Sequence, residues 1–182
     1  MQATSPSETP DVRYPIGRWH RPERVDANTL AEALSTLGEL PQDLRQAVDD
    51  LEDDQLDTPY RENGWTVRQV VHHLADSHSN MSIRIRLALT EAAPVIKPYD
   101  ETAWAALHDS EAAPVEWSLE LVEALHARLL MLLRSLSPAQ WGRTYVHPEN
   151  GEMRLDEVAS MYAWHSRHHV AHITALRTAQ DW

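Results

Sequence analysis

The sequence predicts an all-α protein, a four-helix bundle with a small hairpin before the last helix. Four long segments repeat apolar residues at the helical spacing of three and four. Strand-forming residues gather in only one short stretch, at 143–154. The connections from the second to the third long helix and from the third to the fourth are longer than hairpin loops, which allows crossover connections.

Length and composition indicate one domain with its own core. The chain has 182 residues, of which 42% are hydrophobic and 24% are charged, as is usual for globular proteins. Residues 1–12 are mostly polar and contain two prolines. We therefore expect a flexible tail over 1–12, followed by a single helical-bundle domain over 13–182.

The first helix is expected to begin after Asp26, whose carboxylate suits an N-cap. Apolar residues follow at helical spacing as far as Leu51. Pro41 interrupts this pattern and should kink the helix or split it in two. The acidic region 49–57 is expected to form a solvated end and a turn.

The second helix is expected to begin after Thr66, because Thr66 and Gln69 have the spacing of a capping box. Pro94 should end this helix near Glu91. Asp100 is then placed to cap a short helix, and residues 110–114 should link it to the next long one.

The third long helix is expected to begin after Ser118 as its N-cap. Its apolar face would comprise Leu121, Val122, Leu125, Leu129, Leu132, Leu133 and Leu136. Ser137 and Pro138 then have the order of an N-cap and a first-turn proline, so a brief helical turn should follow.

The small hairpin is predicted from β-forming residues at 143–147 and a return strand at 152–154, joined by a turn at 148–151. The fourth long helix should start at Leu155 or Asp156 and run to about residue 178.

Charge and composition exclude several classes of function. The formal net charge of −12 argues against partners with a phosphate backbone and against anionic membrane surfaces. Cysteine is absent, so any metal must be held by nitrogen and oxygen ligands. No apolar run is as long as a membrane span, and the first residues lack the pattern of a secretory signal. We expect a soluble cytoplasmic protein.

Four histidines lie within residues 165–172 of the expected last helix and form two pairs with a spacing of four, His165 with His169 and His168 with His172. On a helical wheel, His169 falls within about 5° of the centre of the apolar stripe and His165 within about 45°. His168 tends outward, and His172 lies between. A hydrogen-bonded core residue is the usual explanation of one inward histidine, but one divalent cation would satisfy two at once.

The second helix offers His72, His73 and His78 as further ligands. Periodicity favours His78, which lies on the apolar stripe, or leaves the choice open. The remaining histidines show no ligand spacing and are expected on the surface or in loops: His20, His108, His126 and His147. The zincin motif His-Glu-x-x-His is missing, because Ser166 follows His165, and no P-loop, nucleophile elbow or dinucleotide fingerprint occurs.

Four separated motifs resemble the YfiT branch of the DinB-like superfamily. They are the runs at 14–17, 64–78, 97–101 and 164–173, and the resemblance extends from about residue 13 to 176. It implies a four-helix bundle with crossover connections, a homodimer, and a metal held by His73, His165 and His169. The resemblance agrees with the pair chosen by helical phase, and it replaces His78 by His73.

The resemblance also implies a function, because this branch is named for metal-dependent hydrolases and some of its relatives are bacillithiol S-transferases. We expect one divalent ion per subunit, zinc or nickel, and hydrolysis of a small molecule by a metal-activated water. The first alternative is a metal-dependent transferase of a low-molecular-weight thiol of the bacillithiol type. The second is a non-catalytic metal-binding stress-response module.

Two further features bear on this function. A narrow pocket closed by packed tryptophans would favour the non-catalytic module, and the tryptophans that could line a pocket or belong to the core are Trp65, Trp104 and Trp164. Asp76, Asp100 and Glu101 could each act as a general base, and no spacing singles one out. The substrate and the catalytic residues therefore stay open.

Overall fold

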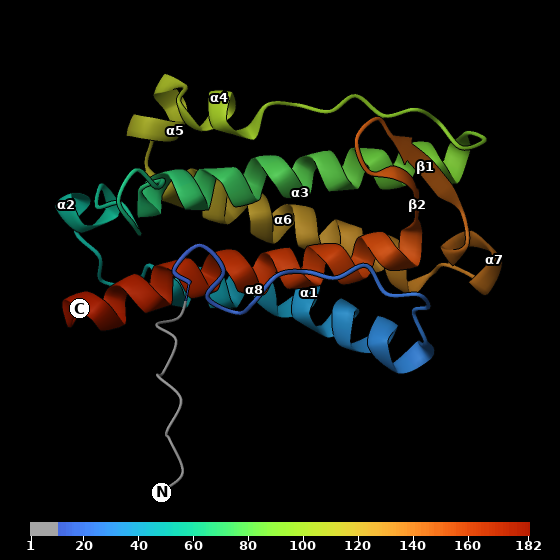
Figure 1. Cartoon of the computed structure of the whole chain (residues 1–182), viewed down its shortest axis with the longest axis horizontal. Coiled ribbons are helices and arrows are strands. Elements are labelled where there is room, and N and C mark those ends of the chain that lie inside the picture. The colour runs from blue at the N-terminus through green and yellow to red at the C-terminus, as the bar shows by residue number, and fades with distance from the viewer. Residues whose placement is uncertain (1–10) are drawn as a thin grey trace, which may run out of the picture.

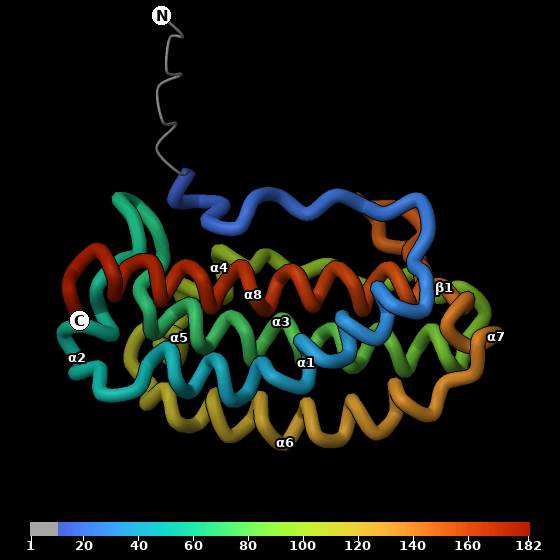
Figure 2. The backbone as a smooth tube through the Cα atoms, turned by 90° about the horizontal axis from the view of Figure 1, so that it is seen from below, coloured from blue at the N-terminus to red at the C-terminus, as the bar shows by residue number. Residues whose placement is uncertain are grey.

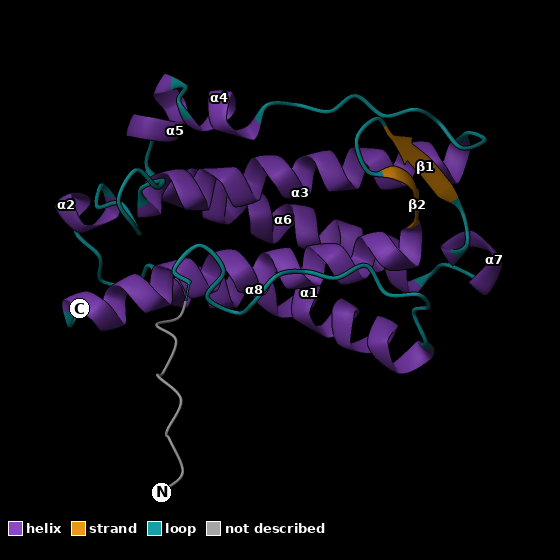
Figure 3. Cartoon of the chain, in the orientation of Figure 1, coloured by secondary structure: helices purple, strands orange, loops and turns teal. Residues whose placement is uncertain are grey.

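A computed structural model describes residues 11–182, so most of the tail expected over 1–12 lies outside the described residues. The four long helices of the bundle are α1 (Ala27–Ala47), α3 (Val67–Thr90), α6 (Val115–Arg134) and α8 (Leu155–Gln180) (Figures 1 and 3). The short helices are α2 (Asp53–Leu56), α4 (Glu101–Ala105), α5 (His108–Ala112) and α7 (Pro138–Trp141). A hairpin of β1 (Thr144–His147) and β2 (Gly151–Arg154) precedes α8, as predicted.

The bundle has an unusual order of helices. Helix α1 packs against α6 and α8, and α3 packs against the same two, so α1 and α3 occupy opposite corners. The neighbours α3 and α6 run in the same direction, and α1 and α8 run the opposite way (Figures 1 and 2). The connection from α3 to α6 therefore crosses the length of the bundle, which confirms the predicted crossover, whereas the connection from α6 to α8 stays at one end.

The crossover is attached to the body at both of its ends. Near its start, the N–H of Val146 in β1 donates to the carbonyl of Pro94, and the N–H of Ile96 donates to the carbonyl of Val146. Near its end, α4 and α5 pack against α3. Asp100 caps α4 as predicted, and the unpredicted α5 overlaps the segment 110–114 that was expected to be a plain link.

Helix α1 continues through Pro41, so of the two predicted effects of the proline, a kink or a split, the split is wrong. Proline has no N–H and leaves the carbonyl four residues earlier without its helical partner. Here that carbonyl belongs to the buried Leu37, and the ring of His126 from α6 donates to it from Nδ1 at 2.6 Å. A side chain from a neighbouring helix thus replaces the missing backbone bond.

The acidic region after α1 does more than form a solvated turn. It contains the unpredicted α2, and its carboxylates at Asp53 and Asp57 accept hydrogen bonds from the buried guanidinium of Arg68 in α3. Helix α3 itself begins at the predicted capping box of Thr66 and Gln69.

Helix α6 begins at Val115 with Pro114 as its N-cap residue, four residues earlier than predicted. Ser118 is therefore a buried residue inside the helix and not its cap. The apolar face is accordingly narrower than expected: Leu121 is 49% exposed, whereas Leu129 and Leu133 are buried. Among the described residues, no helix is both long and apolar enough to cross a membrane.

Candidate metal centre

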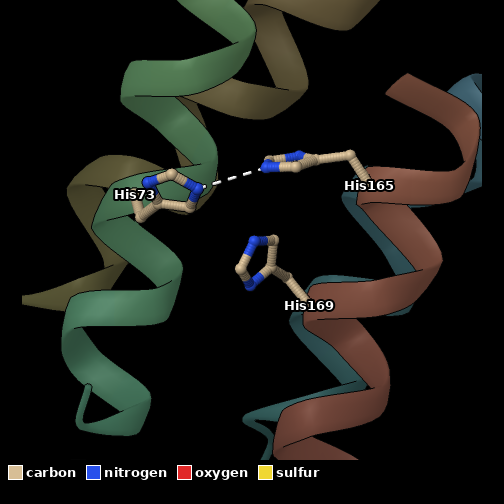
Figure 4. Close-up of side chains that lie close together, drawn as sticks. All are labelled: His73, His165 and His169. Carbon is tan, nitrogen blue, oxygen red and sulfur yellow. Dashed lines mark hydrogen bonds between the residues drawn. The ribbon is translucent and has the colours of Figure 1, made fainter. Parts of the chain in front are cut away.

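Three histidine rings from two helices converge on one point between α3 and α8 (Figure 4). His73 projects from α3, and His165 and His169 project from successive turns of α8. The Nε2 atoms of His73 and His165 lie 3.2 Å apart, and one ligand nitrogen from each of the three rings lies within 4.8 Å of the others. The structure thus brings together the three residues that the resemblance implied.

The spacing and chemistry of these nitrogens suit a divalent metal. Two nitrogens at the usual zinc distance of about 2.05 Å, separated by a tetrahedral angle, lie about 3.3 Å apart. The 3.2 Å between His73 and His165 matches this value. Among residues 11–182, no further histidine, aspartate or glutamate joins the cluster, so three nitrogens would leave coordination positions free.

The environment keeps all three rings neutral, which is the state that binds metal. Burial lowers the pKa of His73 to about 4, with a smaller contribution from the nearby His168. Burial and then the mutual repulsion of the rings hold the pKa values of His165 and His169 well below the ordinary value. Their lone pairs are therefore available across the physiological range of pH.

His172 contacts the Nδ1 side of the His169 ring and orients it. The Nε2–H of His172 donates to the carbonyl of Arg13 at 3.2 Å, so its Nδ1 is an acceptor in the neutral ring. That Nδ1 lies 3.4 Å from Nδ1 of His169, which must then carry the proton. The Nε2 of His169 keeps a lone pair for a metal, an arrangement common behind histidine ligands.

A second chain of rings lies on the other side of His165. His126 donates from Nδ1 to Leu37, so its Nε2 accepts the proton of His78 Nδ1 at 2.9 Å. The Nε2 of His78 therefore bears a lone pair, and within residues 11–182 neither this buried atom nor the buried Nδ1 of His165 has a hydrogen-bond partner. The centroids of these two rings lie 5.6 Å apart, so His78 is a neighbour of the cluster and not a ligand.

The structure corrects two further expectations about histidines. His126 and His147 are buried, at 1% and 9% exposure, although both were expected on the surface or in loops. His147 accepts the backbone N–H of Glu149 at 3.2 Å in the turn of the hairpin. His20 and His108 are exposed, as predicted.

His168 and His72 also lie outside the cluster. His168, which helical phase predicted to tend outward, is buried, and Tyr14 of the N-terminal segment and Trp164 pack against it. His72 donates to the carbonyl of Ala113 at 3.1 Å and lies 2.7 Å from the hydroxyl of Ser118. Hydrogen bonds within the protein thus account for His72.

Two cavities open onto the histidine cluster. The first, which we call the Arg84 cavity, has a volume of about 380 Å³, and all three cluster histidines lie in its wall. The second, the Arg61 cavity, has a volume of about 420 Å³ and reaches His169. Trp65 lies in the wall of both cavities and Trp164 in the wall of the Arg84 cavity, and both cavities remain open. Trp104 is 38% exposed and lines neither cavity.

The three candidates for a general base differ in their surroundings. Asp100 is engaged as the cap of α4, where it accepts the N–H of Ala103 at 2.9 Å. Asp76 lies outside both cavities, and burial raises the pKa of its carboxyl. Glu101 lies in the wall of both cavities. Of the three acidic residues, Glu101 alone lines the cavities at the cluster, a position that could not be predicted from the sequence.

Fold and site together define a class of protein: a four-helix bundle that carries a three-histidine cluster between two helices. A family model described as the DinB superfamily matches residues 36–173. The chain belongs to the DinB superfamily, in the branch that contains YfiT.

Relatives with similar sequences align with nearly the whole of this chain. A protein of Oceanobacillus iheyensis is 50% identical over 170 residues, which cover 93% of this chain and 98% of the relative. YfiT of Bacillus subtilis is 47% identical and covers 94% of this chain and 97% of its own length. Both carry the provisional name metal-dependent hydrolase.

Solved structures support the same fold. The structure of YfiT superposes with a TM-score of 0.91 over 94% of this chain and 98% of that chain, and is described as a probable metal-dependent hydrolase with an unusual four-helix bundle topology. A second four-helix bundle protein, 22% identical, superposes with a TM-score of 0.55 over 84% of this chain and 99% of its own length, and it supports the fold alone.

Proposed function

We propose that this protein is a metal-dependent hydrolase of a small molecule and that His73, His165 and His169 hold its single divalent ion. One observation carries the proposal: three neutral imidazoles meet at the wall of an open cavity, and no fourth protein ligand among the described residues completes the set. Structural metal sites are normally closed by protein, whereas catalytic sites keep a position free for water or substrate.

A divalent cation in such a site lowers the pKa of a bound water and polarises a bound carbonyl or phosphoryl oxygen. The nitrogen donors suit zinc or nickel, and these are the metals we propose. The residues around the cluster prepare the site for this chemistry. His172 holds the tautomer of His169, and Trp65 packs beside His73 with ring centroids 4.6 Å apart, which limits the access of bulk water.

Glu101 is the residue we propose as general base. Its carboxylate belongs to the wall of both cavities, where it can accept a proton from a water or from a substrate. Replacing Glu101 with glutamine keeps the shape and removes the basic oxygen. We expect a loss in kcat of about 10²–10⁴-fold with the bound metal retained; unchanged kcat would exclude this role.

The arrangement of cavities keeps a second candidate function open, a metal-dependent low-molecular-weight thiol S-transferase. Two cavities meet at His169, so a thiol could approach from one side and its electrophile from the other. The same ion would stabilise the thiol in its ionised form. For a non-catalytic metal-binding module we expected a closed pocket, and both cavities are open.

Two assays on the zinc-loaded and nickel-loaded protein separate these functions. The first offers small esters, amides and phosphoesters, and the second offers bacillithiol or another cellular thiol with monochlorobimane. Hydrolysis that requires metal and fails in His169→Ala supports the hydrolase. Conjugation that requires metal supports the transferase, and neither reaction in the loaded protein would contradict both.

Two further expectations remain proposals of the same kind. We propose that the enzyme acts in the cytoplasm and that it is a homodimer. Trp117 and Leu121, which are 66% and 49% exposed on successive turns of α6, offer an apolar surface for a second copy. Light scattering of the wild type and of Trp117→Glu tests the dimer: we expect twice the monomer mass for the first and the monomer mass for the second.

A further inference from the structure

Arg84 is a buried cation in the same cavity as the three histidines. It projects from the interior of α3 and is only 8% exposed. Its guanidinium makes a long hydrogen bond, from Nη2 to the carbonyl of Lys97 at 3.4 Å. The guanidinium lies 5.9 Å from the ring centre of Tyr99, and its interaction with the hydroxyl of Tyr162 opposes the rise in pKa that burial causes there. Among the ion pairs formed within residues 11–182, none involves Arg84.

Arg68 on the same helix shows how this protein satisfies a buried guanidinium whose role is structural. Arg68 is 5% exposed, and it donates to Asp53 at 2.8 Å, to Asp57 at 2.6 Å and to the carbonyl of Ala113 at 3.1 Å. The two arginines are equally buried and differ in partners. Two carboxylates face Arg68, whereas in the part of the chain that the structure describes no carboxylate lies within ion-pair distance of Arg84.

The groups around Arg84 do not neutralise its charge. Burial raises the pKa of Tyr99 to about 12 and also raises the pKa of Tyr162, so both phenols stay neutral. Glu101 and Glu149 belong to the same cavity wall, but both are exposed to solvent. Keeping an arginine buried without a counterion costs free energy, and an anion that enters the cavity would recover it.

The guanidinium group selects the chemistry of that anion. Arginine presents five N–H donors in a planar fork that matches two oxygens of a carboxylate or a phosphate. Tyr162 lies beside both this fork and the cluster, because Arg84 acts on the pKa of its hydroxyl and its ring centroid lies 5.7 Å from that of His165, and all of these residues line the same cavity. One small molecule could therefore reach both places.

We propose that Arg84 binds an anionic group of the substrate, a carboxylate or a phosphate, while the reacting bond lies at the histidine cluster. That the bound anion belongs to a substrate rests on the proposed function, whereas the binding of an anion at Arg84 does not. The substrates to be sought are therefore small molecules that carry a carboxylate or a phosphate at one end and a hydrolysable or electrophilic bond at the other.

The test uses metal-free protein, so that binding to the ion contributes nothing. Inorganic phosphate and succinate are titrated calorimetrically into the wild type, Arg84→Met and Arg86→Met. Arg86 is the matched control, because it lies on the same helix, outside both cavities, and donates to the backbone carbonyl of Ser82. We expect at least tenfold weaker binding in Arg84→Met and wild-type binding in Arg86→Met.

Each outcome decides the proposal. Stronger binding of phosphate assigns the site to phosphate esters, and stronger binding of succinate assigns it to carboxylates. Absence of binding to the wild type, or equal binding by Arg84→Met, would overturn the anion site. Anion binding that depends on Arg84 would uphold it even if no hydrolysis were found, which separates its failure from that of the proposed function.

A second variant guards against misfolding of the first. Arg84→Lys keeps the charge and loses the planar fork, so we expect binding between that of the wild type and that of Arg84→Met. A side-chain NMR signal of Arg84 Nε–H in the wild type, assigned by its absence in Arg84→Lys, should shift on addition of the preferred anion. A signal that does not move would overturn the proposal without recourse to Arg84→Met.

Discussion

Replacing His126 with leucine tests how the bundle tolerates Pro41 in α1. In the wild type, the ring of His126 donates to the carbonyl of Leu37, which Pro41 leaves without a helical partner. The same ring accepts the Nδ1 proton of His78. Leucine fills a similar volume, offers neither bond, and so leaves one buried acceptor and one buried donor without partners.

The expected loss follows from these two groups. A buried polar group without a partner costs about 1–3 kcal/mol, so the two groups together should lower the free energy of unfolding of His126→Leu by about 2–6 kcal/mol. Pro41→Ala restores a backbone N–H that can donate to Leu37. In that background the carbonyl stays satisfied, and His126→Leu should cost about 1–3 kcal/mol less than it does beside Pro41.

Urea unfolding of four metal-free proteins measures this coupling: the wild type, both single variants and the double variant. The cycle cancels whatever Pro41→Ala does by itself through helix propensity or the unfolded chain. If the losses of unfolding free energy in the two single variants add up to that of the double variant within about 0.5 kcal/mol, that result would refute the reasoning. Pro41 and His126 would then not be coupled through the carbonyl of Leu37.

Three further predictions concern the cluster itself. The free energy of unfolding of the metal-free protein should fall as the pH drops below about 6.5. In the unfolded chain His73 binds a proton in this range, whereas in the folded protein it stays neutral because burial lowers its pKa to about 4. The loss from this residue should reach about 3 kcal/mol near pH 4, and it should be missing in urea titrations of His73→Leu; equal slopes for both proteins would contradict it. His78→Leu should change the affinity for zinc by less than about threefold, because Nε2 of His78 and Nδ1 of His165 form no hydrogen bond with each other and His78 therefore does not orient the ligand; competition with a chelator measures this, and a loss of about tenfold or more would show that His78 supports His165. Zinc at 100 times its dissociation constant should raise the free energy of unfolding by about 2.7 kcal/mol in the wild type and not in His169→Ala, and a gain in both would place the ion elsewhere.

Helical phase in the sequence was sufficient to select His165 and His169 in α8. Helical phase did not select His73 in α3, where it favoured His78 or left the choice open. Helix α3 packs against α6, α8 and the crossover, so most of its surface is covered and a single apolar stripe does not tell which neighbour a side chain meets. His78 points to His126 of α6, whereas His73 points to α8, and the resemblance supplied what periodicity lacked.

The helix caps at Asp26, Thr66 and Asp100 could also be predicted, because a cap depends on residues only three or four positions apart. The burial of His126 was missed, since the partner of that ring is a carbonyl 89 residues away. Arg84 was missed for a similar reason. A buried arginine without a counterion can be recognised only when the whole surrounding shell is known.

The most direct test of the central claim is the metal content and visible spectrum of the chain loaded with cobalt(II). We expect one ion per chain with nitrogen ligands for the wild type and for His108→Ala, an exposed histidine outside the cluster. We expect loss of that ion in His73→Ala, His165→Ala and His169→Ala, because each supplies one of the three nitrogens. Full occupancy and an unchanged spectrum in any of these three variants would contradict the proposed centre.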